Sequence, residues 1–226
     1  MSHDIQYNIN IPVVWYDFLS PTKILAQTDW NILSEFSVSA DGVTTPTGAI
    51  VNIYPSTANR GIRVSPDGKT AIVISGVGAD VTVIRVNGDS DFSVVQQFNP
   101  GINNYNPGAV HFSPDSRYAA IRFSSFICIY SIANDSRLTE ISRAIIPQVN
   151  GNASMGVSHD FRIAVAGDRM LVNGVHKTFF FVYRIHENGM IEYLPDKDYV
   201  CLGHFTDIAF VPPQVTDAEP AWSRYE

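Results

Sequence analysis

Three short segments of the chain approach patterns that carry catalytic chemistry. Gly156-Val157-Ser158-His159-Asp160 approaches the nucleophile-elbow pattern, but it lacks the second glycine and no helical segment follows it. His186-Glu187 lacks the second histidine of a zinc-protease motif. Gly76-Val77-Gly78 lacks the third glycine and the helix of a phosphate-binding loop, and reads as a hairpin turn. The sequence therefore predicts no catalytic residue in these three segments.

Ser158 belongs instead to a repeated pattern of strand, turn and strand. The clearest copy, Ile62–Ile74, reads IRVSPDGKTAIVI, and Val110–Arg122 reads VHFSPDSRYAAIR. A weaker copy, Met155–Gly167, reads MGVSHDFRIAVAG, and a damaged copy begins at Ser20. The turn serines are 45 to 48 residues apart. A period of this length is typical of the blades of a β-propeller, which bury their faces by stacking.

The repeated acidic residues Asp67, Asp115 and Asp160 could be taken for catalytic carboxylates. Each occupies the same place in its turn, where an aspartate accepts hydrogen bonds from the backbone that follows it. In the full motif, proline presets φ and glycine tolerates positive φ. We therefore interpret these aspartates as structural.

The units fit an all-β fold. We predict a β-propeller domain over residues 1–211, built from about four four-stranded blades, followed by a polar C-terminal arm, 212–226. An extra strand at Thr206–Val211 repeats the first strand of a unit; either it closes a small ring, or several chains complete a larger one. The predicted strands are 13–19, 24–27, 32–38 and 49–54; 62–64, 70–75, 81–86 and 92–98; 109–112, 118–123, 126–132 and 138–145; and 154–157, 163–166, 178–185 and from 190 onward.

The composition excludes several classes of protein. The 226 residues are 45% hydrophobic, enough for one large core, and the net charge of -7 argues against nucleic-acid binding. Cys128 and Cys201 do not make a disulfide framework. Met1–Asn10 has no signal-peptide pattern and no apolar run is long enough for a membrane span, so we expect a soluble protein, cytoplasmic or part of a virion.

The Ser-Pro-Asp-Gly-Lys turn at Ser65–Lys69, between an apolar strand and a strand rich in Ala, Ile and Val, resembles the WD40-like and YVTN (lactonase-type) β-propeller superfamily. The resemblance covers about residues 12–211. Ser158–Arg162 departs from the motif at two places, and the Trp-Asp ending of WD40 blades is absent. The resemblance therefore implies the fold and no particular subfamily.

Enzymes of this superfamily usually hold a metal over the central channel, at the ends of the inner strands. The residues two before each turn serine would line that channel, and no carboxylate is among them: Phe18, Arg63, His111 and Gly156, with Ala209 in the fifth copy. A calcium or magnesium site needs several oxygen ligands, and the neighbouring Asp17 and Asp207 could supply only two. We therefore predict no metal and no cofactor.

The loops Tyr54–Arg60 and Asn99–Asn106 are rich in Asn, Pro, Gly and Tyr. Tyrosine and arginine on rigidly held loops are favoured at protein interfaces. With the channel-lining residues, they give the predicted binding residues: Tyr54, Arg60, Arg63, Tyr105 and His111.

The sequence thus favours a non-enzymatic interaction or assembly module, such as a structural subunit of a virion or phage tail, associated with other protein subunits as a homo- or hetero-oligomer. The alternative is a metal-dependent lactonase-like or sugar-hydrolysing propeller enzyme. A cluster of three or more acidic or amide side chains at the channel mouth would favour that alternative.

Overall fold

The computed structural model describes residues 15–29, 31–53, 59–75, 81–101, 109–123, 125–147 and 154–202, together with Ile208 and Phe210. The described residues form four antiparallel sheets, each a β-meander whose strands pair in chain order. Blade 1 is β1 (Tyr16–Ser20), β2 (Lys23–Asp29), β3 (Ile32–Val38) and β4 (Thr44–Asn52); blade 2 is β5 (Asn59–Val64), β6 (Thr70–Ser75), β7 (Val81–Gly88) and β8 (Asp91–Phe98). Blade 3 is β9 (Ala109–Phe112), β10 (Tyr118–Arg122), β11 (Phe126–Ile132) and β12 (Leu138–Ile145); blade 4 is β13 (Ser154–Val157), β14 (Ile163–Val172), β15 (Val175–Ile185) and β16 (Ile191–Tyr193), with β17 (Tyr199–Leu202) also paired to β15.

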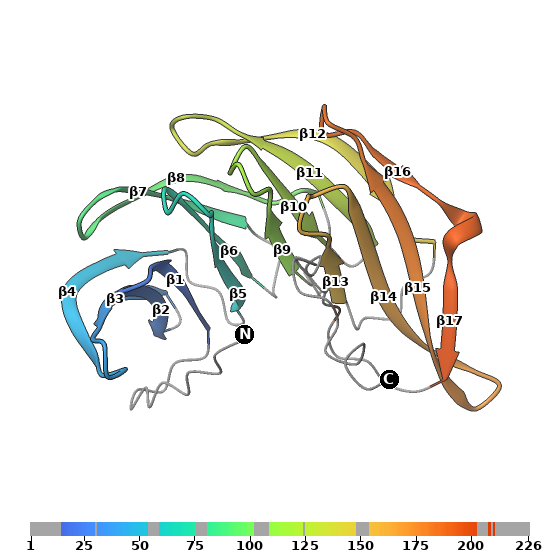
Figure 1. Ribbon diagram of the computed structural model, residues 1–226, viewed down its shortest axis with the longest axis horizontal. Helices are drawn as coiled ribbons and strands as arrows, with labels where there is room; N and C mark the ends of the chain where they lie inside the picture. Colours follow the sequence, from blue (N-terminus) through green and yellow to red (C-terminus); the bar gives the residue numbers. More distant parts are fainter. Residues whose placement is uncertain are drawn as a thin grey trace, which may run out of the picture.

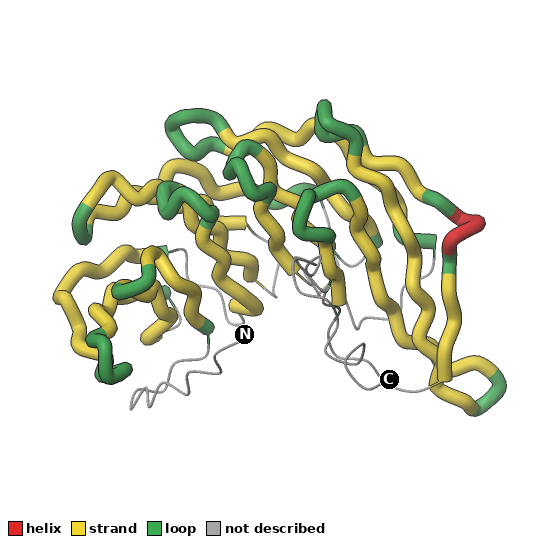
Figure 2. Tube along the Cα trace, in the orientation of Figure 1, coloured by secondary structure: helices red, strands yellow, loops and turns green. Residues whose placement is uncertain are grey.

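The four blades fan around an open arc (Figure 1). The first strands β1, β5, β9 and β13 lie side by side on the concave side, and the last strands lie toward the convex side. Figure 2 shows that the described residues are almost entirely strands and turns. The prediction of an all-β propeller of four four-stranded blades plus an extra strand is confirmed.

Apolar side chains between neighbouring blades hold the arc together. Leu25, Leu33 and Ile62 belong to the cluster between blades 1 and 2. The other two interfaces have clusters of the same kind. Strands β6 and β10 contribute to the cluster between blades 2 and 3, and β10 and β14 contribute to the cluster between blades 3 and 4. Many of these side chains are fully buried. Burial of each such Leu or Ile stabilises the folded state by roughly 1.5–3 kcal/mol. Strands buried on both faces explain the nearly continuous apolar runs in the sequence.

The repeated turns are built as the sequence predicts. The Ser65 hydroxyl donates to Asp67 Oδ1 at 2.7 Å and accepts from the Thr70 N–H at 2.9 Å. The turns that begin at Ser113 and Ser158 repeat both bonds. The aspartates are thus bonded within their turns, which confirms the structural interpretation.

Several strands differ from the prediction in their bounds, most of all β4 and the hairpin of β14 and β15. The expected loop at Thr44–Gly48 is instead part of β4, which pairs with β3 through a register shift between Ser34 and Phe36. Pro46 is tolerated because β4 is the outer strand of its blade. β14 and β15 are longer than predicted because Asn173-Gly174, both at positive φ, form a tight hairpin turn between them.

The extra strand of the structure is β17, whereas the strand predicted at Thr206–Val211 lies mostly outside the described residues. Ile208 and Phe210 are described, in no strand. The Ile208 carbonyl oxygen lies 2.6 Å from the position that a Cβ of Gly156 would take. The chain therefore passes directly against β13, and only glycine fits there.

The helical content of the described residues is one short 3-10 turn, Pro195–Lys197. None of the described helices has the length and apolar character needed to cross a membrane. The predicted arm 212–226 and the segment Met1–Asn10 lie outside the described residues.

Candidate functional site

The inner strands of blades 1, 2 and 3 each carry a polar residue at an equivalent register position. Arg63 pairs with Ile72 and His111 pairs with Ala120, and both partners pack toward the next blade. In blade 1 the matching residue is Asp17, which pairs with Leu25. Phe18, predicted from the spacing to the serine, is therefore wrong by one residue. The reason is a register shift between Phe18 and Ser20, which shortens the first turn.

Asp17 joins blade 1 to blade 2. Its Oδ2 accepts the Val64 N–H at 2.8 Å, and its Oδ1 accepts the Phe18 N–H at 2.9 Å. Burial raises the pKa of this carboxyl above 3.8, while both hydrogen bonds and the positive charge of Arg63 act to lower it. Asp17 and Arg63 thus lie close enough to interact electrostatically.

His111 joins blade 3 to blade 4 in a similar way. Its Nε2 lies 2.9 Å from the Met155 carbonyl oxygen. Because a carbonyl oxygen only accepts, Nε2 carries the hydrogen, and Nδ1 is the basic nitrogen of the neutral ring. Arg63 belongs to blade 2, between these two residues in blade order. Its side chain is exposed, and its Nη1 donates to the carbonyl oxygen of the preceding residue, Ile62, at 3.3 Å. We call Asp17, Arg63 and His111 the channel row.

The channel row combines a carboxylate, a guanidinium and an imidazole on three rigid, adjacent strands. An imidazole with a fixed tautomer can take a proton from water. A guanidinium can stabilise an oxyanion that develops on a carbonyl. These are the groups that water attack on an ester needs.

The side chains of the other predicted binding residues lie outside the described part of the chain. Tyr54 and Tyr105 lie outside the described residues, as do Asp207 and the turn Gly76–Gly78. Arg60 is in β5, but its side chain is not described. In blade 4 the row position is Gly156, which has no side chain to contribute.

The alternative reading of the sequence, a metal-dependent lactonase-like or sugar-hydrolysing enzyme, requires a set of metal ligands. Among the residues that the structure describes, no three His, Cys, Asp or Glu side chains group as they would around a metal ion. Both oxygens of Asp17 accept backbone hydrogen bonds. The described channel row therefore does not fit a metal site, and we derive no step through one.

Arg122 is a buried charged residue that the sequence patterns did not indicate. It is fully buried at the end of β10, and its Nη1 donates to the carbonyl oxygens of Ser154 and Gly167 in blade 4. Burial lowers its pKa to about 10, and the negative charge of Asp168, 1% exposed, opposes that shift. Arg122 stays charged at neutral pH. The one signal in the sequence is an arginine ending an otherwise apolar strand, YAAIR.

Comparison with known proteins gives a family match. The sequence profile of the family described as lactonase, 7-bladed β-propeller, matches residues 32–195, well over half of the chain. No curated protein is significantly similar to the chain in sequence.

Solved structures share the fold at low sequence identity. A candidate 6-phosphogluconolactonase from Bacteroides uniformis is 19% identical with a TM-score of 0.67, covering 83% of this chain and 55% of its own. One from Bacteroides fragilis is 18% identical with a TM-score of 0.64, covering 80% and 53%. The periplasmic gluconolactonase of Pseudomonas aeruginosa is 15% identical with a TM-score of 0.61, covering 76% and 50%. The chain spans about half the length of these structures.

These similarities correct the functional prediction. The interpretation as a non-enzymatic assembly module, such as a virion or phage-tail subunit, is wrong, because the profile and the solved structures are of lactonase type. The comparisons favour the enzymatic alternative. The sequence misled because the turn motif encodes blades whatever chemistry they carry.

Proposed function

Because the chain belongs to the seven-bladed β-propeller lactonase family, we propose that it takes part in the hydrolysis of a sugar-acid lactone at the channel row. The observation that carries the proposal is the placement of Asp17, Arg63 and His111 at one position of three adjacent inner strands.

The reaction needs three events. Water attacks the lactone carbonyl, the negative charge that develops on the carbonyl oxygen is stabilised, and the ring C–O bond breaks to give a hydroxy acid. In the proposal, His111 Nδ1 accepts the proton of the water and returns it to the leaving ring oxygen. The Arg63 guanidinium stabilises the oxyanion. Asp17 is a positioning residue whose negative charge orients Arg63.

Hydrolysis of glucono-δ-lactone by the purified full chain, measured above the spontaneous rate, tests the proposal. We expect His111→Gln and Arg63→Met to lower kcat/KM by about 100-fold each, in the range found for acid–base and oxyanion groups. The matched controls His186→Gln and Arg137→Met, on exposed turns, are expected to keep the wild-type value. No catalysis by the wild-type chain, or equal losses in the controls, would show that the proposal is wrong.

Association with further protein subunits stays a prediction. Light scattering of the purified chain tests it: a mass that is a multiple of 25.0 kDa would support a homo-oligomer. A mass of 25.0 kDa at all concentrations would contradict it.

A further inference from the structure

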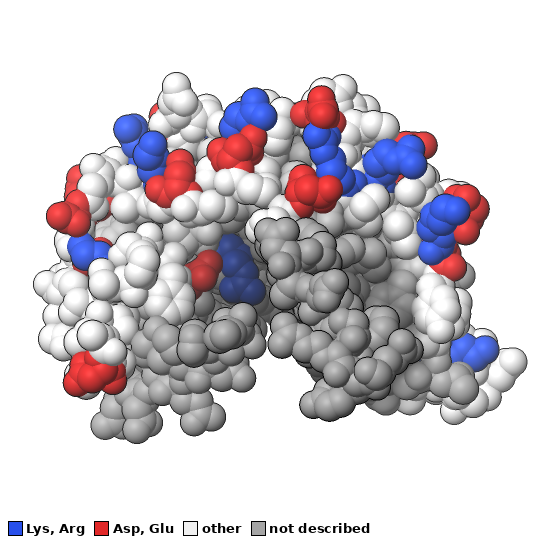
Figure 3. All heavy atoms as spheres, in the orientation of Figure 1, with Lys and Arg blue, Asp and Glu red and all other residues white. Residues whose placement is uncertain are grey.

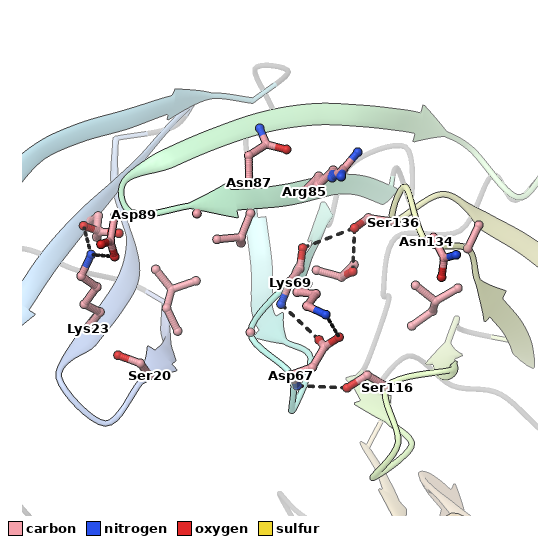
Figure 4. A pocket seen from close by; sticks show the side chains of 18 of the residues that line it. Ser20, Lys23, Asp67, Lys69, Arg85, Asn87, Asp89, Ser116, Asn134 and Ser136 are labelled. Carbon is pink, nitrogen blue, oxygen red and sulfur yellow. Dashed lines mark hydrogen bonds and ion pairs between the residues drawn. The ribbon is translucent and has the colours of Figure 1, made fainter.

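A polar groove lies where turns of neighbouring blades meet (Figure 4). Turns from blades 1, 2 and 3 line it, and its volume is about 830 Å³, within the range of small-molecule sites. Its labelled side chains include Lys23, Asp67, Lys69 and Arg85. We call it the turn-face groove.

Basic and acidic side chains lie next to one another on the described part of the face shown in Figure 3. Most charged side chains in the turn-face groove likewise have a neighbour of opposite sign. Lys23 Nζ lies 3.1 Å from Asp89 Oδ1 and 3.4 Å from Glu35 Oε1. Glu35 is 2% exposed and also accepts the Ser90 hydroxyl at 2.6 Å. The Lys23–Asp89 pair joins blade 1 to blade 2. This wall of the groove holds one cation and two carboxylates, so Lys23 offers no unpaired positive charge there.

Lys69 is held much more loosely than its equivalents in the next two blades. Lys69, Arg117 and Arg162 all donate their backbone N–H to the turn aspartate, which identifies them as one repeat position. Arg117 and Arg162 each make an ion pair at 2.6 Å, with Asp115 and Glu187 respectively. Lys69 Nζ lies 4.0 Å from Asp67 Oδ2, at the limit of an ion pair, and is 76% exposed.

Arg85 also lacks the acidic partner that the arginine at the same repeat position of blade 4 has. It pairs across the sheet with Thr70 and Ser93, and the residues at its repeat position are Ser131 in blade 3 and Arg184 in blade 4. Arg184 has a carboxylate beside it, Glu192, at 3.5 Å. Arg85 has Ser93 in that place. Among the described residues, Arg85 makes no hydrogen bond or ion pair.

The groove is also held rigidly around these two cations. The Asp67 N–H donates to the Ser116 hydroxyl at 3.0 Å, and the Thr70 and Ser136 hydroxyls are 2.9 Å apart. The Ser136 hydroxyl also donates to the Lys69 carbonyl oxygen at 3.3 Å. Blade 3 thus fixes the backbone of Lys69 while its ammonium group stays available.

We propose that the turn-face groove binds a small molecule through a phosphate monoester, held by Lys69 and Arg85. The two cations without close partners match the roughly -1.5 to -2 charge of a phosphate monoester at neutral pH. Arg85 can offer two parallel hydrogen bonds and Lys69 a point charge. The carboxylates that share the groove, Asp67 and Asp115 among them, disfavour a polyanion such as nucleic acid. This inference is independent of lactone hydrolysis.

Calorimetric titration of the purified full chain with glucose 6-phosphate, inorganic phosphate, gluconate and glucose tests the proposal. We expect saturable binding of the two phosphates and weaker or no binding of gluconate and glucose. Lys69→Met and Arg85→Met should each weaken phosphate binding about tenfold or more, as for the loss of a hydrogen bond to a charged group. Lys69→Gln provides a second variant at the same position.

The matched controls are Arg162→Met and Arg184→Met, which remove the cations at the same repeat positions of blade 4. They should leave phosphate binding unchanged. The proposal is wrong if neither phosphate binds at millimolar concentrations, or if glucose binds as tightly as glucose 6-phosphate. Equal losses in the blade 2 and blade 4 variants would also overturn it, because they would show a general effect of charge.

Discussion

Arg122 in blade 3 donates a hydrogen bond from its guanidinium Nη1 to the carbonyl oxygen of Gly167 in blade 4, at a distance of 2.6 Å. Arg122 is fully buried, and its charge interacts with that of Asp168. The hydrogen bond and the charge interaction cross the interface of blades 3 and 4, beside an apolar cluster. Arg122 therefore links the two blades at one defined register.

Removal of this link should destabilise the fold. We expect Arg122→Met to lower the free energy of unfolding by about 3 kcal/mol, because a buried carboxylate and two carbonyl groups lose their cation. Urea denaturation measures the change. The control is Arg137→Met, which breaks the ion pair of Arg137 with Asp135; the Arg137 side chain is 65% exposed. This variant should change the free energy of unfolding by less than about 0.5 kcal/mol. Similar effects of the two variants would contradict this role of Arg122.

The close approach of Ile208 to β13 makes Gly156 sensitive to substitution. We expect Gly156→Ala to lower the free energy of unfolding by about 1–3 kcal/mol, because a Cβ would lie 2.6 Å from the Ile208 carbonyl oxygen and 2.7 Å from its Cγ2. Gly61→Ala is the matched control on inner strand β5, where no atom lies within 4 Å of the added Cβ. Thermal unfolding of both variants checks the expectation, and an equal effect at the two positions would refute the contact.

Asp115 should make the stability of the folded protein depend on pH. The Ser113 hydroxyl and Arg117 lower the pKa of Asp115 from 3.8 to about 2. A lowered pKa in the folded state stabilises the fold above pH 3.8, and this contribution is lost as the pH falls through about 2. The difference in Tm between the wild type and Asp115→Asn should therefore shrink as the pH falls. Ser113→Ala removes the largest cause of the shift and should show the same trend; a difference that grows in acid would contradict it.

The pH dependence of lactone hydrolysis should reflect Asp17. Because burial raises the pKa of Asp17, it becomes protonated at a pH above 3.8, and its protonated form no longer attracts Arg63. We expect kcat/KM to fall in acid with a midpoint above pH 3.8, and this component of the profile to be absent in Asp17→Asn. Asp196→Asn, on the exposed 3-10 turn, is the control and should keep the wild-type profile. An acid limb unchanged in Asp17→Asn would remove Asp17 from the mechanism.

The sequence was sufficient for the blades because each is determined locally. The turn serine and aspartate bond to the backbone within five residues of themselves, and apolar strands beside them need neighbours on both faces. Local patterns of this kind appear directly in the sequence. The Asn173-Gly174 turn is an equally local signal, and it accounts for the long hairpin of blade 4.

Only the tertiary structure decided which side chains share a site. A one-residue register shift in blade 1 places Asp17, and not Phe18, beside Arg63, and no periodicity in the sequence records such a shift. The pairing of Arg122 with Gly167 joins two blades, and residues of three blades line the turn-face groove. The sequence by itself determined the repeating unit, because its hydrogen bonds are local; the stacking of the units decided the chemistry, because every candidate site is assembled from more than one of them.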